Sequence, residues 1–177
     1  EEALRRSEKR FQSIANLVPD LLWDSEHNGS TNWYNQRWLE YTGQGFEQAI
    51  GWGWVEAIHP DDREGSAKRY SEAVAVGKPL RHEHRIRRYD GKYRWFVVNA
   101  SPLKDENGQV VKMYGSATDI HDSKLAEEAL RERAARFRTL ADAVPQVIWT
   151  NTPDGEAAYF NQRWYEYSGL SWEESRV

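Results

Sequence analysis

The N-terminal residues show the apolar spacing of a helix. Five positions follow one another at alternating distances of three and four residues: Leu4, Ser7, Phe11, Ile14 and Val18. This spacing places them on one face of a helix that ends before Pro19, because proline disfavours the helical conformation at the preceding residue. Since Ser7 interrupts the apolar row, packing on its own domain and pairing with a second copy both stay open.

Turn and cap residues then divide residues 20–43 into short elements. Residues 20–25 and 31–34 are predicted strands, joined by a hairpin turn at Asn28-Gly29. Residues 35–41 are a predicted helix, for which Asn35 is a suitable N-cap and Gly43 a stop signal.

Residues 60–76 carry the signals of a longer helix. Pro60 suits the first helical position, and Asp61 and Asp62 favour the positive end of the helix dipole. Gly77 and Pro79 end this predicted helix.

Three longer strands are predicted next, at residues 80–89, 92–103 and 109–120, with turns at Asp90-Gly91 and at residues 105–108. If the first turn has two residues, His84 lies opposite Val97 and His82 opposite Asn99. The order of elements predicts an α+β fold: a five-stranded antiparallel sheet with helices on one face, flanked by an N-terminal helix and a linker helix.

The chain contains an internal repeat. Shifted by 126 positions, residues 1–51 align with residues 127–177 without a gap, and twenty of the 51 pairs are identical. The repeat predicts four segments: a flanking helix at 1–18, a complete domain at 19–121, a helical linker at 122–143 and the start of a second, truncated domain at 144–177. Asp122 or Ser123 is the expected cap of the linker helix.

The second copy buries little surface because it is short. We therefore expect residues from about Val144 onward to be poorly ordered or to borrow a surface from a neighbour. We also expect the sequence to be a fragment of a longer protein.

A series of motifs occupies these elements in a fixed order. They are Val18-Pro19, Trp23, Asn28-Gly29, Tyr34-Asn35, Tyr41-Thr42-Gly43, Ile58-His59-Pro60-Asp61-Asp62-Arg63, Glu83-His84-Arg85, Asp90–Trp95, Asp105–Gly108, Gly115 and Asp119-Ile120. With these motifs the chain resembles the PAS domain and its C-terminal PAC segment, in full over about residues 12–121 and in part over 138–177.

The resemblance implies a sheet whose helices enclose a cavity, and a domain that relays a sensed change through flanking helices to an output domain. Family members often end in Asp-Ile-Thr, where this chain has Asp119-Ile120-His121. Asp119 can still bridge the strand end and the helix start, but the threonine hydroxyl is lost. Asp119 and His121 are therefore the candidate residues for signal relay.

Aromatic residues supply the candidate ligand site. Trp23, Trp38, Tyr41 and Trp54, with Trp52 beside them, are suited to line a cavity for a flat ligand, or else they fill the core. His59 is the fifth candidate, although it also has a structural role before the helix start at Pro60.

Two further histidines, His82 and His84, share one face of a strand because they lie two residues apart. They form either a polar cluster or a solvated strand face. Without a third ligand they are a poor zinc site, and we expect no metal.

Composition excludes several other functions. The sequence has no cysteine, so a chromophore bound through a thiol is excluded, and flavin or haem would have to bind without that covalent bond. The net charge of −4 gives no basic surface for nucleic acid. No phosphate-binding loop or nucleophile elbow is present, so we expect no catalytic domain in this chain.

Two functions remain. The first is a sensory module of a bacterial signal-transduction protein, for which a sensor histidine kinase is the expected parent, relaying a ligand- or partner-dependent change through the linker helix. The alternative is a flavin- or haem-binding redox or gas sensor, or the input region of a cyclic-di-GMP enzyme.

The expected partners are a second copy, through the flanking helices, and a C-terminal output domain. We expect a cytoplasmic location without direct membrane contact, although the parent protein could be anchored elsewhere.

Overall fold

The computed structural model describes residues 2–176. The side chain of Leu4, which the sequence places on the apolar face of the first helix, lies outside the described part. The chain forms two compact units, the first ending at Lys124 and the second beginning at Leu125. No helix among the described residues is long and apolar enough to cross a membrane.

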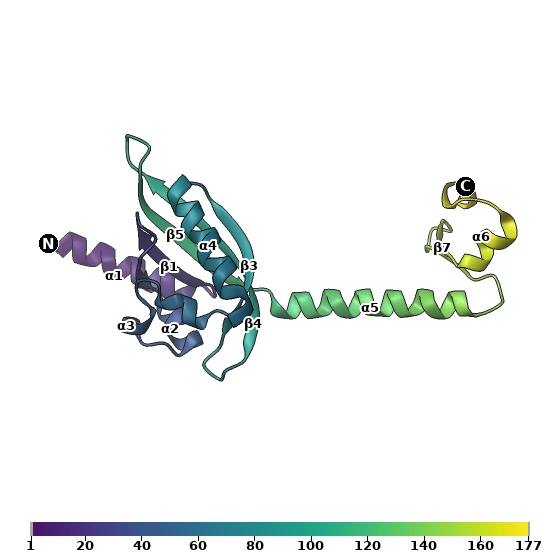
Figure 1. Cartoon of the computed structure of the whole chain (residues 1–177), viewed down its shortest axis with the longest axis horizontal. Coiled ribbons are helices and arrows are strands. Elements are labelled where there is room, and N and C mark those ends of the chain that lie inside the picture. The colour runs from purple at the N-terminus through teal and green to yellow at the C-terminus, as the bar shows by residue number, and fades with distance from the viewer. Residues whose placement is uncertain (1, 177) are drawn as a thin grey trace. The chain divides into compact units, whose positions relative to one another are not determined.

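Unit 1 contains one antiparallel sheet of five strands in the order β2-β1-β5-β4-β3 (Figure 1). The strands are β1 (Leu21–Glu26), β2 (Thr31–Tyr34), β3 (Leu80–Arg87), β4 (Tyr93–Lys104) and β5 (Val110–Asp119). The central position of β5, beside β1, brings the last strand of the unit next to the first. The predicted α+β class and five-stranded antiparallel sheet are confirmed.

Two helices of unit 1, the one that follows β2 and the one that precedes β3, begin and end at the predicted signals. The helices of this unit are α1 (Glu2–Leu17), α2 (Gln36–Thr42), α3 (Phe46–Ala49), the 3₁₀ helix Gly53–Ala57 and α4 (Pro60–Val76). Asn35 caps α2 through its side chain, and Gly43 and Gly77 adopt the left-handed conformation after α2 and α4. The short helix α3 was not predicted, since four residues show no helical periodicity.

The hairpin between β3 and β4 differs from the two-residue turn predicted at Asp90-Gly91. The amide of Arg88 donates to the carbonyl of Lys92, so the loop has three residues, and Gly91 has a φ of 83°. The Asp90 carboxylate favours this loop because it accepts from the Lys92 amide and the Arg88 guanidinium. The predicted register was therefore wrong by one residue.

The start of the helix after β5 also differs from the prediction. Helix α5 (His121–Ala143) begins before Asp122 and Ser123, the two predicted caps. The carboxylate of Asp119 accepts instead from the amide of His121 at 2.9 Å. Asp122 lies in the first turn and pairs with Arg94.

The core of unit 1 lies between the sheet and its helices and is rich in aromatic rings. Trp23 covers Gly115 so closely that a Cβ at residue 115 would lie 2.1 Å from the indole ring. A glycine at this position of β5 therefore allows the buried tryptophan to lie flat against the neighbouring strand.

Unit 2 contains the rest of α5 and four short elements: β6 (Trp149–Asn151), β7 (Ala157–Phe160), α6 (Gln162–Ser168) and α7 (Trp172–Ser175). Asn161 is fully buried, and its Nδ2 donates to the carbonyls of Ala141 and Gln146 at 2.8 and 2.9 Å. Asn35 makes the same two bonds to the carbonyls that lie 126 positions earlier. The repeated sequence therefore forms the same local structure.

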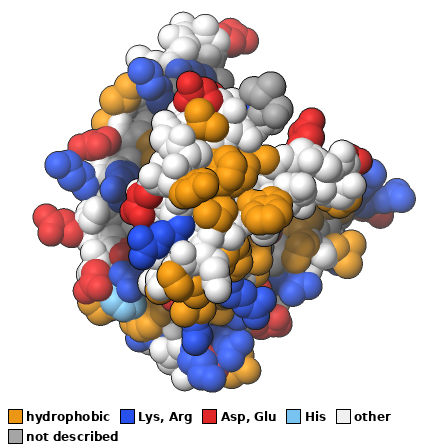
Figure 2. Space-filling model, turned by 90° about the vertical axis from the view of Figure 1, so that its right-hand side faces the viewer, with side chains coloured by type: hydrophobic (Ala, Val, Ile, Leu, Met, Phe, Trp, Pro, Cys, Tyr) orange, Lys and Arg blue, Asp and Glu red, His pale blue; other side chains and the backbone are white. Residues whose placement is uncertain are grey.

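Large apolar side chains of unit 2 stay exposed. Trp149 is 60% exposed, whereas its counterpart Trp23 is 8% exposed. In unit 1 the strand β5 pairs with β1 beside Trp23, and within residues 125–176 no strand takes that place beside β6. Figure 2 shows hydrophobic side chains gathered on one face of the molecule. This short segment buries little apolar surface, as its length predicts.

Candidate functional site

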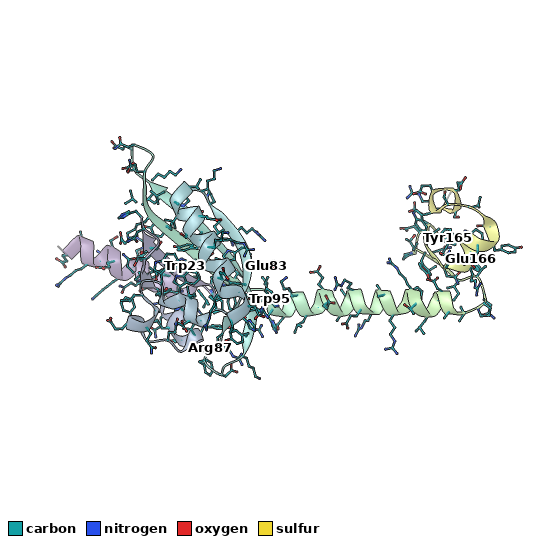
Figure 3. All side chains as sticks on the ribbon, in the orientation of Figure 1. Trp23, Glu83, Arg87, Trp95, Tyr165 and Glu166 are labelled. Carbon is teal, nitrogen blue, oxygen red and sulfur yellow. The ribbon has the colours of Figure 1, made fainter. Side chains whose placement is uncertain are left out.

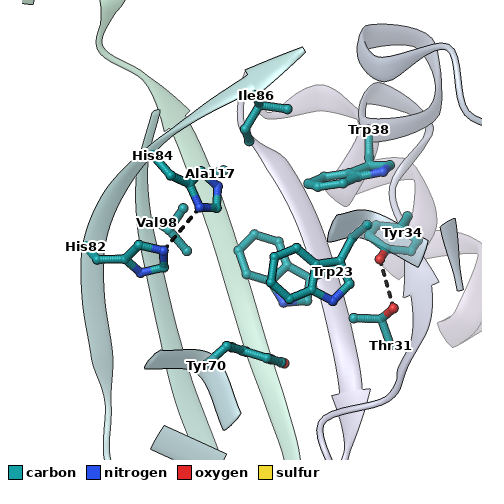
Figure 4. Close-up of a pocket in the computed structure, with 11 residues that line it drawn as sticks. Trp23, Thr31, Tyr34, Trp38, Tyr70, His82, His84, Ile86, Val98 and Ala117 are labelled. Carbon is teal, nitrogen blue, oxygen red and sulfur yellow. Dashed lines mark hydrogen bonds between the residues drawn. The ribbon is translucent and has the colours of Figure 1, made fainter. Parts of the chain in front are cut away.

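A cavity of about 20 Å³ lies in the core of unit 1. Eleven residues line it, and all except His82 are buried: Trp23, Thr31, Tyr34, Trp38, Trp54, Tyr70, His82, His84, Ile86, Val98 and Ala117. In Figure 4 the two histidines lie on one side of this space and Trp38, Tyr34 and Thr31 on the other. The cavity therefore joins side chains from all five strands of the sheet, from α2 and α4, and from the 3₁₀ helix.

Hydrogen bonds between the lining residues and their neighbours occupy most polar groups around this cavity. Thr31 Oγ1 and the Tyr34 hydroxyl are 2.8 Å apart, and the Tyr70 hydroxyl lies 2.6 Å from Ser25 Oγ. The indole nitrogen of Trp38 donates to Gln44 Oε1 at 3.3 Å. As a result, the surface that faces the cavity is almost entirely carbon.

The histidines of β3 form a hydrogen-bonded row, in which His84 is buried and His82 is partly buried. His82 Nε2 lies 3.1 Å from His84 Nδ1, which lies 2.9 Å from Ser66 Oγ of α4. The prediction of a polar cluster therefore holds and that of a solvated strand face was wrong. Burial lowers the pKa of His82 to about 4, helped by Arg69. Burial lowers the pKa of His84 to about 3, helped by His82 and opposed by Asp62. Both rings are neutral at neutral pH.

These lowered pKa values predict acid sensitivity. The ordinary histidine pKa is 6.5, so the unfolded chain takes up protons below this pH while the folded chain stays unprotonated to about pH 4 or 3. The histidine contribution to stability is complete above pH 6.5 and is lost as the pH falls, by about 1.4 kcal/mol per pH unit for each histidine. Urea unfolding of His84→Gln, compared with the unchanged protein between pH 6.5 and 4, should give a flatter pH dependence. Parallel curves for the two proteins would contradict this prediction.

Three of the five candidate ligand residues lie together. Trp23, Trp38 and Trp54 line the cavity, while Tyr41 and His59 do not. The Tyr41 ring packs edge-on against Phe96, and its hydroxyl is buried without a partner.

His59 lies at the start of α4, where its Nδ1 accepts from the amide of Asp61 at 3.3 Å. Its ring packs against Tyr93 at a centroid distance of 4.6 Å. These contacts give His59 the structural place that its position before Pro60 predicts. Trp52, the neighbouring aromatic residue, is 40% exposed.

Sequence reasoning missed several lining residues, chiefly Thr31, Tyr34, Tyr70 and the aliphatic group Ile86, Val98 and Ala117. One signal was present: Leu80–Arg87 alternates histidine or isoleucine with charged residues at positions 82–87, which is typical of a strand with one buried face. No comparable signal marks Tyr70, which faces the cavity from α4.

The candidate relay residues Asp119 and His121 lie where the sheet ends and α5 begins. Arg94 Nε donates to Asp119 Oδ2 at 2.6 Å, and Arg94 Nη2 donates to Asp122 Oδ2 at 2.9 Å. One guanidinium on β4 therefore joins the end of β5 to the first turn of α5. The Arg94 guanidinium lowers the pKa of Asp122. The backbone adds a further bond, from the Ile120 amide to the Trp95 carbonyl.

A second set of contacts lies on the outer face of the sheet. Lys124 Nζ of α5 lies 2.6 Å from Glu83 Oε2 and 4.9 Å from the centre of the Trp95 ring. Arg85 also approaches this ring, at 5.2 Å. Figure 3 shows Glu83 and Trp95 close to the start of α5.

Arg85 extends these contacts to α4. Its guanidinium and its amide both donate to the carboxylate of Asp62, and this pairing lowers the pKa of Asp62. Glu83 and Arg85 alternate along β3 with His82 and His84, which face inward. The strand β3 therefore carries the histidines of the cavity on one face, and on the other face Glu83 and Arg85, which contact α5 and the first turn of α4.

Flavin and haem do not fit this cavity. Sites for such ligands measure roughly 300–1,000 Å³, against about 20 Å³ here. No group of three or more ligating side chains among residues 2–176 could hold a metal ion.

The antiparallel sheet, the helices against one face and the cavity between them define an α+β domain of the PAS class. A family model described as "PAS fold" matches residues 32–117, and one described as "PAS domain" matches residues 135–177. The chain belongs to the PAS domain family.

Relatives are found in bacteria and fungi. The uncharacterized protein y4lL of Sinorhizobium fredii is 34% identical over 175 residues, which are 99% of this chain and 21% of that protein. The peroxide stress-activated histidine kinase mak1 of Schizosaccharomyces pombe is 35% identical over 154 residues, 84% of this chain and 9% of that protein. This chain thus spans about a fifth of the length of the first relative and less than a tenth of the second.

A solved structure agrees with this assignment. The sensory box histidine kinase/response regulator of Burkholderia thailandensis is 25% identical and aligns with a TM-score of 0.54, covering 73% of this chain and 98% of the solved one.

Proposed function

We propose that the chain is a sensory module of a signal-transduction protein whose output is a histidine kinase. The PAS domain of unit 1 biases the orientation of α5, and α5 passes this change toward the output domain. The observation that carries the proposal is the bridge from Arg94 to Asp119 and Asp122, which ties the first turn of α5 to two strands. The relatives and the solved structure described as histidine kinases support the choice of output. Such an output uses ATP, so the proposal places the module in the cytoplasm.

The relay in this proposal runs through Asp119, as its position predicts, whereas His121 contributes its backbone amide. The lost threonine hydroxyl is offset by the guanidinium of Arg94, a charged donor that forms stronger hydrogen bonds than a hydroxyl. The contacts of Lys124 with Glu83 and Trp95 hold the same turn of α5 from the other strand.

The proposal includes a homodimer formed through the flanking helices. Leu130, Phe137 and Leu140 of α5 are 46–66% exposed and are spaced by seven and three residues. In α1, Phe11, Ile14 and Leu17 are also exposed, at spacings of three. Spacings of three, four and seven residues are typical of helices that pair with another helix, so a second copy is the proposed partner.

Replacing Arg94 by alanine tests the bridge. We expect amide hydrogen exchange in the first turn of α5 to accelerate about three- to tenfold, because the loss of two charged hydrogen bonds makes local opening easier. Arg88→Ala is the matched control, since Arg88 forms the same kind of pair with Asp90 in the β3–β4 loop. Unchanged exchange in Arg94→Ala, or equal acceleration in both variants, would remove the support for a relay through this bridge.

A further inference from the structure

The cavity of unit 1 has the properties of a dry site. Five of its lining residues carry side-chain hydroxyl or imidazole groups, yet almost none of their polar surface faces the space. The bonds of Thr31 with Tyr34, of Tyr70 with Ser25 and of His84 with Ser66 turn these groups away. Trp54 Nε1 and His82 Nδ1 are buried without a partner, and the surface of the cavity exposes almost no polar atom.

Water and charged ligands are disfavoured in such a space. A buried water needs two to four polar partners, and cavities without them stay empty or bind apolar atoms such as xenon. A charged group would lose its hydration without a compensating bond. Because burial lowers the pKa of His82 and His84, both rings are neutral and place no charge beside the cavity.

Size restricts the ligand further. About 10–15 Å³ suffices for one water-sized molecule, and the cavity measures about 20 Å³. It therefore has room for one molecule of two or three atoms. Five aromatic rings surround it and provide polarizable surface for dispersion contacts: Trp23, Tyr34, Trp38, Trp54 and Tyr70.

We propose that this cavity binds a small, uncharged, apolar gas molecule of the size of dioxygen directly, without a cofactor. The inference rests on the proposed sensory function and names the ligand class of its cavity. The position of the cavity suits a site that receives the sensed signal. The strand β3, whose His82 and His84 line the cavity, contacts α5 through Glu83.

Methyl-resolved NMR of the whole chain under xenon tests the site, with xenon as an apolar probe. We expect the methyl resonances of Ile86, Val98 and Ala117 to shift with a saturable dependence on xenon. The exposed methyls of Val111 should change linearly, because they lie outside the cavity. Methanol, a polar probe of similar size, should produce no saturable shift. Under dioxygen, the three cavity residues should show stronger paramagnetic broadening than other buried methyls, such as those of Val74.

The matched variants are Val98→Ile and Val111→Ile, which add the same methylene group inside and outside the cavity. Val98→Ile should weaken xenon binding at least about tenfold, and Val111→Ile should leave it unchanged. Any one of four results would overturn the proposal. With xenon, these are linear shifts in the unchanged protein or full binding by Val98→Ile. With the other probes, they are saturation by methanol as strong as by xenon, or dioxygen broadening no stronger than at Val74. If Val98→Ile does not fold, the titrations of the unchanged protein still decide the question.

The outcomes also separate this inference from the relay. Hydrogen exchange in Arg94→Ala is measured without any gas, so it tests the bridge alone. Accelerated exchange combined with absent xenon binding would overturn the gas site and leave the relay intact.

Discussion

Replacing Asn35 by alanine is expected to lower the free energy of unfolding of unit 1 by about 3–5 kcal/mol, one of the largest effects of any single polar residue. Asn35 is 1% exposed and its side chain makes four hydrogen bonds. Nδ2 donates to the carbonyls of Ala15 and Asp20, and Oδ1 accepts from the amides of Leu22 and Trp38. One amide therefore joins the end of α1, the start of β1 and the start of α2.

The size of this effect follows from burial. Alanine removes the partner of the part-buried Leu22 amide and of two carbonyls, and an unsatisfied buried polar group costs about 1–3 kcal/mol. Urea unfolding followed by circular dichroism measures the loss. Asn32→Ala is the control, because Asn32 is an exposed residue of the neighbouring strand. A loss below about 1 kcal/mol, or one equal to that of the control, would show that the amide does not hold these elements together.

Inserting one residue after Arg131 in the parent protein is expected to abolish stimulus-dependent output. Each residue of an α-helix turns the chain by about 100°, so one extra residue rotates everything that follows it, whereas seven residues complete almost two turns. Arg131 lies within α5, beyond the contacts of Lys124 with the sheet. Seven inserted residues should therefore preserve regulation.

Autophosphorylation of the parent kinase, measured with and without stimulus, distinguishes the two insertions. One residue added to the exposed turn Asp105–Gly108 is the control, since this loop lies at the far end of β4 and should leave output unchanged. Equal regulation after insertions of one and seven residues would mean that α5 acts as a tether, not as a relay that depends on helical phase.

Local signals in the sequence predicted most of the fold of unit 1. Asn35, Pro60 and Gly77 act within one turn of their own helix, so their positions alone locate the ends of α2 and α4. The predictions were wrong for one loop length and one helix start, because side-chain contacts that the sequence pattern does not show determine both. The loop at Asp90 gained a residue through pairing of Asp90 with Arg88, and α5 began early because Asp119 caps it from the preceding strand.

The candidate site was harder to predict than the fold. The alternation in β3 shows that His82 and His84 share a face, but periodicity does not tell which face is buried. Tertiary packing also separates Tyr41 and His59 from the three tryptophans, since Tyr41 packs on Phe96 and His59 on Tyr93. Which aromatic residues face one space depends on contacts between elements far apart in the sequence.

The buried asparagine of each repeat has a consequence for the order of folding. Asn161 reaches carbonyls only 15 and 20 residues away, and Asn35 spans the same separations. Such short loops close at low entropic cost. The junction of the leading helix, the hairpin and the short helix that follows can therefore assemble on a growing chain before a distant strand such as β5 has left the ribosome. We expect this junction to act as an early folding nucleus in each copy.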